Sequence, residues 1–339
     1  MAETALDDRR RQVLGAVIQE YVETAEPVGS RAVARHSSLR LSPATIRNTM
    51  ADLEELGYLD QPHTSAGRVP TDKAYRFYVD SLTDRPGLPE TGVTPPAGQL
   101  APSQTGVEQV MEQASVHLSA ASRMTAVLLA PPLKQTRLVR LDLIPLRSDR
   151  ALAVVITEGG WVTTRTLTLE PQVVLEDLRE VGQRLSRRFQ GKTVQEIVDE
   201  VAAPADPLDP LHTRTGSLVE QVFALLRDRT LYIGGAINVL EYPEFWHLAT
   251  MRAILRTFEE KERLIELLSQ LATETGIQVM IGRENPFEEI QECSLVTSAY
   301  TYENQVLGIL GVLGPKRMPY ERLIPLVDEM ARLVSHSLS

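Results

Sequence analysis

The chain has 339 residues, a formal net charge of −10 and a single cysteine, Cys293. One cysteine excludes an intramolecular disulfide and a zinc finger built on several cysteines. No apolar run approaches the ~20 residues of a membrane span, and the polar N-terminus lacks a signal-peptide core, so we expect a cytoplasmic protein with no membrane partner. The length indicates two or three domains. The acidic total argues against a chain that coats nucleic acid along its whole length, but allows a local basic face.

The first elements predict a small helical unit. Apolar residues recur on one face of residues 6–22, which is typical of an amphipathic helix. The Pro-Val-Gly sequence at 27–29 predicts a turn, and Ser30 is a suitable N-cap for a short second helix. Arg31 and Arg35 lie four residues apart, so they share a face of that helix and could both reach phosphates.

A third helix is predicted from 42 to 57, because both of its ends are marked. Ser42 can cap the first free amides, Pro43 fits the first turn, and Gly57 can take the left-handed conformation that ends a helix. The apolar residues recur at helical spacing and form one stripe: Ile46, Met50, Leu53 and Leu56.

The opposite face of this helix is small and polar near the N-terminus. Ala44 and Asn48 lie on it, and Thr45 and Arg47 flank it. Asn can bind adenine and Arg can bind guanine in the major groove, so the face suits DNA recognition within a helix-turn-helix. Residues 27–51 contain no Asp or Glu and carry four arginines: Arg31, Arg35, Arg40 and Arg47. An ordinary amphipathic surface helix is the alternative.

Two short strands are expected directly after this helix. Residues 58–59 and 68–70 flank a polar, Gly-containing segment, which predicts a hairpin that could serve as the wing of a winged helix. Arg68 at its base, with His63 and Ser65 at its tip, could approach phosphates or the minor groove. A plain surface hairpin is the alternative. A further helix at 72–82 concentrates aromatic residues, which favours packing over stacking on bases.

The rest of the chain predicts an α+β body. Residues 84–106 are rich in Pro and Gly and lose hydrophobic periodicity, as a linker does. A helix at 107–122, strands between 126 and 169, helices mostly between 170 and 257, strands between 277 and 313 and a final helix from 320 fit one α+β domain with an insertion. The predicted units are 1–83, the linker 84–106, the body at 107–169 and 258–339, and the insert at 170–257.

The sequence offers no arrangement typical of catalysis. The six histidines lack the spacing of a helical metal site. The sequence has neither the G-x-S-x-G pattern of a nucleophile elbow nor a phosphate-binding glycine loop. Cys293 fits the role of a small buried hydrophobe better than that of a nucleophile. We therefore predict no metal, no cofactor and no enzyme activity.

Motifs along almost the whole chain resemble one known family. They are Pro-Val-Gly-Ser-Arg at 27–31, Ser-Pro-Ala-Thr-Ile-Arg-Asn at 42–48, Gln-Pro-His-Thr-Ser-Ala-Gly-Arg-Val-Pro-Thr at 61–71, Pro-Glu-Phe at 243–245 and Gly-Pro-Lys-Arg-Met-Pro-Tyr at 314–320. This pattern resembles the HrcA family of heat-inducible transcription repressors. The resemblance implies a winged helix-turn-helix followed by a GAF-like domain that carries an inserted dimerisation domain.

The resemblance also implies a function. A homodimer would repress heat-shock chaperone operons of the groESL and dnaK type by binding the CIRCE inverted-repeat operator in double-stranded DNA. Heat shock would release it, and the GroEL chaperonin would modulate its activity. Two alternatives from other classes are a regulator whose GAF-like domain senses a small molecule, and a chaperone-docking adaptor without sequence-specific DNA binding.

The expected DNA-binding residues fall into groups. The base-reading group is Ala44, Thr45, Arg47 and Asn48. The phosphate-binding group is Arg31, Arg35, Arg40, Ser42 and Arg68, and the wing tip adds His63 and Ser65.

Overall fold

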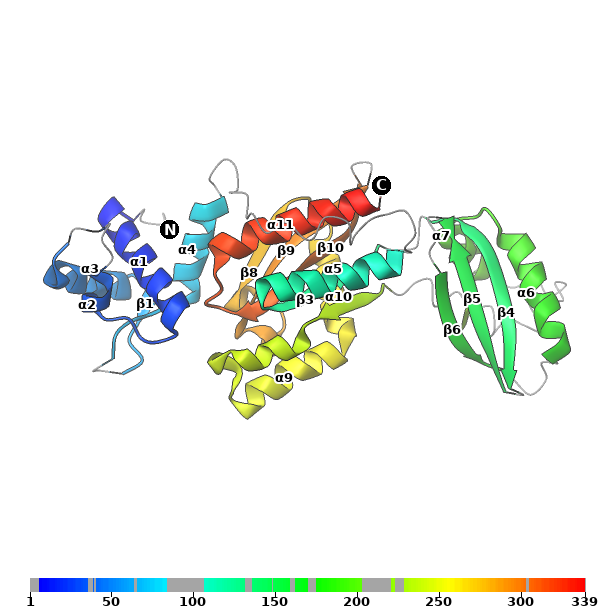
Figure 1. Cartoon of the computed structure of the whole chain (residues 1–339), viewed down its shortest axis with the longest axis horizontal. Coiled ribbons are helices and arrows are strands. Elements are labelled where there is room, and N and C mark those ends of the chain that lie inside the picture. The colour runs from blue at the N-terminus through cyan, green and yellow to red at the C-terminus, as the bar shows by residue number, and fades with distance from the viewer. Residues whose placement is uncertain are drawn as a thin grey trace.

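The computed structural model describes residues 6–35, 39, 41–63, 66–83, 107–131, 136–147, 149–158, 162–169, 175–202, 221–222, 229–302 and 305–338. These residues form an elongated molecule (Figure 1). A winged-helix unit lies at one end, an α+β domain lies in the middle, and a small unit of sheet and helices lies at the other end. We call them the head, the central domain and the distal unit. The predicted linker at 84–106 and residues Arg40 and Ser65 lie outside the described residues.

The head has the element order of a winged helix-turn-helix. It comprises α1 (Asp8–Thr24), α2 (Ser30–Val33), α3 (Pro43–Glu55), β1 (Leu59–Asp60), β2 (Val69–Pro70) and α4 (Asp72–Thr83). The predicted apolar stripe of α3 packs inward, with Ile46 and Leu53 fully buried beside Leu14 and Ile18 of α1. Burial of such side chains stabilises a fold by about 1.5–3 kcal/mol each.

Local sequence signals set the ends of α3. The Oγ of Ser42 accepts a hydrogen bond from the backbone N–H of Thr45 at 3.1 Å, and Pro43 lies in the first turn. Gly57 has a φ of 77°, in the left-handed region that glycine adopts at least cost. The cap predicted for the second helix is wrong. Gly29 is the N-cap of α2, and Ser30 is already its first helical residue.

The central domain is built on a five-stranded sheet in the order β7-β3-β10-β9-β8, with antiparallel neighbours throughout. Its strands are β3 (Thr125–Leu129), β7 (Leu231–Gly234), β8 (Ile277–Ile281), β9 (Cys293–Tyr302) and β10 (Gln305–Pro315). Its helices are α5 (Val107–Ser122), α9 (Leu248–Glu259), α10 (Lys261–Leu271) and α11 (Tyr320–Ser337). Short 3-10 turns complete it: η3 (Ala236–Glu241), η4 (Pro243–Phe245), η5 (Gly282–Glu284) and η6 (Glu288–Ile290).

Helices cover both faces of this sheet. Successive side chains of a strand point to opposite faces. Along β3, Ala126 and Leu128 join the core that contains residues of α5 and α11. Val127 and Leu129 join a second core, which contains residues of α9 and α10. The central domain therefore has three layers, and Figure 1 shows α5 and α11 together on one side of the sheet.

The distal unit has its own sheet and its own core. The strands β4 (Leu138–Arg147), β5 (Arg150–Thr157) and β6 (Val162–Thr168) pair antiparallel in that order. Among the described residues, the helices α6 (Leu175–Phe189) and α7 (Val194–Ala202) belong to this unit. Leu141, Leu143 and Val155 of the sheet pack with Leu185 of α6 in a cluster separate from the two cores of the central domain.

The chain passes from the central domain into the distal unit and returns from it at neighbouring positions. It is inserted between β3 and β7, which are neighbours in the sheet. Leu129 lies opposite Leu231, and the backbone N–H of Ala130 donates to the carbonyl of Thr230 at 2.8 Å. The two ends of the insertion therefore lie side by side.

The predicted boundaries of the insertion are wrong. The strands at 138–168, expected in the body, form the distal sheet, whereas α9, most of which falls within the insert expected at 170–257, packs on the central sheet. The physical reason is that alternating apolar residues predict a strand but not its pairing partner. Within the insert expected at 170–257, residues 170–174, 203–220 and 223–228 lie outside the described residues.

Candidate nucleic-acid interface

The N-terminal half of α3 presents the predicted recognition face. Ala44, Arg47 and Asn48 are exposed, and Thr45 is half-buried. Arg47 and Asn48 make no hydrogen bond or ion pair with any described residue. Figure 1 places α3 at the end of the molecule, with α4 between it and the central domain. The two side chains that can bind base edges therefore face outward.

The hydroxyl groups of Ser42 and Thr45 lie together at the N-terminus of α3. Besides its bond to the Thr45 N–H, the Oγ of Ser42 lies 2.9 Å from the Oγ1 of Thr45. A hydroxyl has one donor and two acceptor positions, so each keeps capacity for another partner. The capping role of Ser42 was indicated by the sequence and is present in the structure. The contact between the hydroxyls of Thr45 and Ser42 was not predicted from the sequence.

Two of the three acidic side chains of α3 are paired with arginines of the head. Asp52 receives a hydrogen bond from Arg10 of α1 at 3.0 Å, and this bond raises the pKa of the arginine. Glu54 pairs with Arg68, whose Nε and NH2 groups lie 2.8 and 2.7 Å from Oε2 of Glu54. An uncompensated carboxylate beside DNA would repel phosphates, so both pairs make the surface more favourable to a polyanion.

Arg68 has a second role that its position in the sequence does not reveal. The sequence predicts a phosphate ligand, but the side chain also ties the base of the wing to α3 across 14 residues of sequence. The side chains of Arg68 and Glu54 are only 20% and 33% exposed, which limits screening of the pair by solvent. No short-range periodicity marks such a pair.

The wing is anchored to the turn that precedes α2. Val28 and Arg68 exchange two backbone hydrogen bonds of 2.9 Å, which adds a bridge beside the β1–β2 pair. Gly67 lies so close to this turn that a Cβ on it would overlap the carbonyl group of Val28. Glycine is therefore required there by space. Two of the sequence motifs, at 27–31 and 61–71, thus meet in one structural unit.

Exposed basic residues flank the recognition face. Arg31 and Arg35 are exposed, with Arg31 inside α2 and Arg35 just beyond its end. Neither has an ion pair with a described residue. His63 is exposed on the wing. These positions are compatible with contacts to the DNA backbone on both sides of α3.

The described residues carry neither a metal-binding cluster nor a membrane-spanning helix. None of their helices is long and apolar enough to cross a lipid bilayer. Among the same residues, no group of three or more His, Cys, Asp and Glu side chains is placed to hold a metal ion. Burial raises the pKa of the Cys293 thiol well above its usual range, so the thiolate needed for nucleophilic attack is disfavoured.

Two family models match the chain in the order of its units. The model described as "Winged helix-turn-helix transcription repressor, HrcA DNA-binding" matches residues 5–81. The model described as "HrcA protein C terminal domain" matches residues 108–324, across the central domain and the distal unit.

Named relatives match over nearly their whole length. The heat-inducible transcription repressor HrcA of Geobacter sulfurreducens is 38% identical over 340 residues, covering 99% of this chain and 99% of that protein. The corresponding repressor of Symbiobacterium thermophilum is 35% identical, covering 97% of this chain and 98% of that protein. A crystal structure titled as a hypothetical protein superposes with a TM-score of 0.67 at 23% identity, covering 98% of this chain and 99% of that chain. That last likeness concerns the fold alone.

Proposed function

Because the chain belongs to the HrcA family of heat-inducible transcription repressors, we propose that it represses heat-shock chaperone operons by binding an inverted-repeat operator as a dimer. Members of this family repress transcription through a DNA-binding winged helix and are not enzymes. The proposed operator is the CIRCE inverted repeat before operons of the groESL and dnaK type. A bound dimer represses by occluding the polymerase, and the proposed site of action is the cytoplasm.

The main support for this proposal is the exposed face of α3. Arg47 and Asn48 stand exposed near its N-terminus, while the acids Asp52 and Glu54 behind them are paired with arginines. A recognition helix enters the major groove with its N-terminal residues, where a bidentate Arg–guanine or Asn–adenine contact discriminates by about 1–3 kcal/mol. Direct readout is therefore assigned to Arg47 and Asn48, with Ala44 and Thr45 in apolar or hydroxyl contact beside them.

Other residues of the head are assigned to the phosphates. Such contacts fix the register of the protein on DNA and carry no sequence information. The proposed residues are Arg31, Arg35, Arg40 and Ser42 before and at the start of α3, and His63, Ser65 and Arg68 on the wing. Arg68 keeps guanidinium hydrogens for a phosphate besides those directed at Glu54.

A two-fold symmetric dimer matches the symmetry of an inverted repeat. The distal unit offers a surface for it. On its sheet, Leu141 and Leu143 face the helices, whereas their neighbours Asp142 and Ile144 point the other way. This open face carries Ile144, Leu152, Val154, Ile156 and Val162, and pairs of strand positions bring them together, with Ile144 opposite Leu152 and Ile156 opposite Val162.

We assign this open face to a second copy of the chain. Apolar side chains on three adjacent strands gather on this face, beside the ion pair of Arg140 and Asp142, and exposed apolar patches mark association sites. Two identical faces can pack as an isologous sandwich, with sheets about 10 Å apart. This arrangement supports the dimerising role that we propose for the insertion.

Heat and the chaperonin are proposed to act on this dimer. Heat shock releases the repressor from DNA, and the GroEL chaperonin keeps it active under normal conditions. Release follows either because the chaperonin is diverted to unfolded proteins or because the dimer itself loses structure. The central domain, whose antiparallel sheet is covered on both faces, is the unit that we propose to be GAF-like.

The decisive experiment is footprinting with the purified full-length protein. We expect protection of both arms of an inverted repeat, on the DNA upstream of its own gene and on synthetic duplexes, and no protection of scrambled DNA. Absence of protection at moderate ionic strength, even with added chaperonin, would contradict the proposal.

A second measurement tests the dimer. Val154→Lys places a charge in the open face and should yield monomers in sedimentation, whereas Gln183→Lys, exposed on α6, should leave the dimer intact. If Val154→Lys remains dimeric, the contact lies elsewhere.

A further inference from the structure

The head and the central domain share one apolar core. A single cluster of buried side chains runs from α1 and α3 through α4 into α5, α11 and the sheet. Where the head meets the central domain, the ring centroids of Tyr75 on α4 and Tyr320 on α11 lie 6.1 Å apart. Both residues are at most 2% exposed. Units that share a core of this kind move together, because separating them would expose apolar surface to water.

Beside this apolar contact, charged residues of α4 pair with residues of the central domain. Arg76 pairs with Glu284 of η5, whose carboxylate holds the pKa of the arginine above its usual value. Asp72 accepts a hydrogen bond from the backbone N–H of Arg283 at 3.1 Å and lies 3.4 Å from the Nζ of Lys316. Charged side chains therefore join α4 to two separate segments of the central domain.

A second anchor holds the end of α1. Arg317, in the short segment before α11, donates to the carbonyl of Val22 at 2.9 Å and pairs with Glu244. Its guanidinium also lies 5.8 Å from the ring centre of Tyr242. The Arg317 side chain is only 14% exposed, so loss of either partner would leave a poorly solvated charge.

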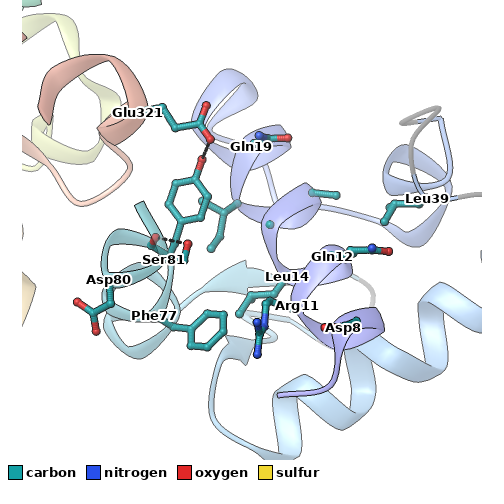
Figure 2. A pocket seen from close by; sticks show the side chains of 14 residues that line it. Asp8, Arg11, Gln12, Leu14, Gln19, Leu39, Phe77, Asp80, Ser81 and Glu321 are labelled. Atoms are coloured by element: carbon teal, nitrogen blue, oxygen red, sulfur yellow. Dashed lines mark hydrogen bonds between the residues drawn. The ribbon is translucent and has the colours of Figure 1, made fainter. Parts of the chain in front are cut away.

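A third anchor lies beside an open hollow. Tyr78 of α4 donates a hydrogen bond of 2.8 Å to Glu321 of α11, and Figure 2 shows this bond at the edge of the hollow. The hollow has a volume of about 820 Å³ and lies between α1 and α4. Solvent therefore reaches this edge of the contact. We call the contact between Asp72, Tyr75, Arg76 and Tyr78 and their partners, together with the Arg317 anchor, the joint.

We propose that the joint sets the spacing between operator half-sites that the dimer accepts, with Arg76 and Arg317 as positioning residues. This inference rests on the proposed dimer on an inverted repeat. Three anchors at different places around one apolar contact prevent the head from pivoting on the central domain. Each recognition helix is then presented at one orientation relative to its own central domain, which removes one hinge from the path between the two heads.

The physical basis is the effective concentration of the second head. When one head is bound, the other meets its half-site at a local concentration that is highest if the connection matches the span. Each added base pair moves a half-site by about 3.4 Å and rotates it by about 34°, so a rigid connection fits few spacings. A loosened joint lets the head reach several spacings but lowers the local concentration at the best one.

The test uses full-length protein and duplexes whose half-sites are separated by spacers that grow by one base pair. The main variant combines Arg76→Gln and Arg317→Gln. The matched control is Arg263→Gln, because Arg263 pairs with Glu289 inside the central domain and neither residue takes part in the contacts of the joint. A milder variant, Tyr78→Phe, removes the hydroxyl that donates to Glu321 and guards against misfolding of the main variant. A duplex with a single half-site reports on the head alone.

We expect the wild type and Arg263→Gln to favour one spacing sharply. The joint variant should lose that preference by about tenfold or more. Its affinity for a single half-site should stay unchanged, and Tyr78→Phe should show a smaller loss in the same direction. A merely structural defect would lower binding to every duplex alike.

An unchanged spacing profile in a folded joint variant would overturn the inference while leaving the repressor function intact. A wild type that binds an inverted repeat no better than a single half-site would instead contradict the proposed dimeric function. Uniform loss of binding to all duplexes, single half-sites included, would also overturn the role of the joint in spacing.

Discussion

Arg68 at the base of the wing and Glu54 on α3 form an ion pair, with the two nearest guanidinium nitrogens 2.8 and 2.7 Å from one carboxylate oxygen. The pair joins the two elements that approach DNA in a winged helix. It fixes the angle between wing and helix and removes an uncompensated negative charge from the DNA side. A residue that looks like a phosphate ligand in the sequence is thus also part of the scaffold.

Replacing Glu54 by Gln should lower the free energy of unfolding by about 1 kcal/mol, because a partly buried charged hydrogen bond is lost. Urea denaturation measures this change. A double-mutant cycle with Arg68→Gln isolates the pair, and we expect a coupling energy of about 0.5–1.5 kcal/mol. A coupling energy near zero would show that the pair does not hold the wing.

Arg47→Ala combined with Asn48→Ala should abolish the preference for operator over scrambled DNA while leaving dimerisation intact. The reason is that both side chains are exposed and have no described partner, so their removal costs little stability. Gel-shift titrations on both duplexes measure the preference. Glu55→Gln, exposed on the C-terminal half of α3, is the matched control and should retain it. Unchanged discrimination in the double variant would refute the recognition helix.

Arg31→Gln and Arg35→Gln should each weaken binding to all DNA sequences alike. A lost phosphate contact reduces the slope of log affinity against log salt by about 0.9. Binding titrations over a range of salt concentrations measure the slope, and Arg263→Gln should not alter it, since its pair with Glu289 is in the central domain. A slope that stays constant would remove the arginine concerned from the phosphate-binding group.

Gly67→Ala should destabilise the head, because the added methyl group would overlap the Val28 carbonyl. We expect a loss of about 1–3 kcal/mol and weaker DNA binding, since the wing must shift. Gly15→Ala on α1 is the matched control: no atom outside its own helix lies within 4 Å of the added methyl group, and helix propensity favours Ala by about 1 kcal/mol. Thermal unfolding of both variants tests the contrast, and equal effects of the two substitutions would contradict it.

Two buried tyrosines should respond oppositely to loss of the hydroxyl. The hydroxyl of Tyr75 finds no hydrogen-bond partner among the described residues, whereas that of Tyr320 lies 2.8 Å from both the Ser294 Oγ and the Lys316 carbonyl. Tyr75→Phe should therefore be neutral or stabilising, and Tyr320→Phe should cost about 1–3 kcal/mol by leaving partners unsatisfied. Chemical denaturation gives both values. A destabilised Tyr75→Phe would indicate an ordered water at that hydroxyl.

Features encoded by neighbouring residues were predictable. The Ser42 cap, the Pro43 start and the Gly57 stop of α3 are local hydrogen-bonding and dihedral effects, and all three are present in the structure. The hairpin after α3 was predictable for the same reason, because its turn residues and strand residues are adjacent. The exposed face of α3 followed directly from helical periodicity.

Features that depend on distant residues were not predictable. The pairing of β3 with β7 spans the whole distal unit, so the strands of the insertion were assigned to the wrong sheet. The bond from Arg317 to Val22 joins residues 295 positions apart. Such contacts depend on how the elements pack in three dimensions, and apolar periodicity indicates only which face of an element is buried. The base and phosphate contacts themselves stay predictions.

The entry and exit of the insertion at Leu129 and Leu231 have an engineering consequence. Because paired antiparallel strands end there together, a tight hairpin turn can replace everything between them without breaking the central sheet. The distal unit, to which we assign the association of two copies, could therefore be removed as a block. An unrelated coiled coil of chosen stoichiometry in its place would then set how many copies assemble, without any change in the sequence of the head.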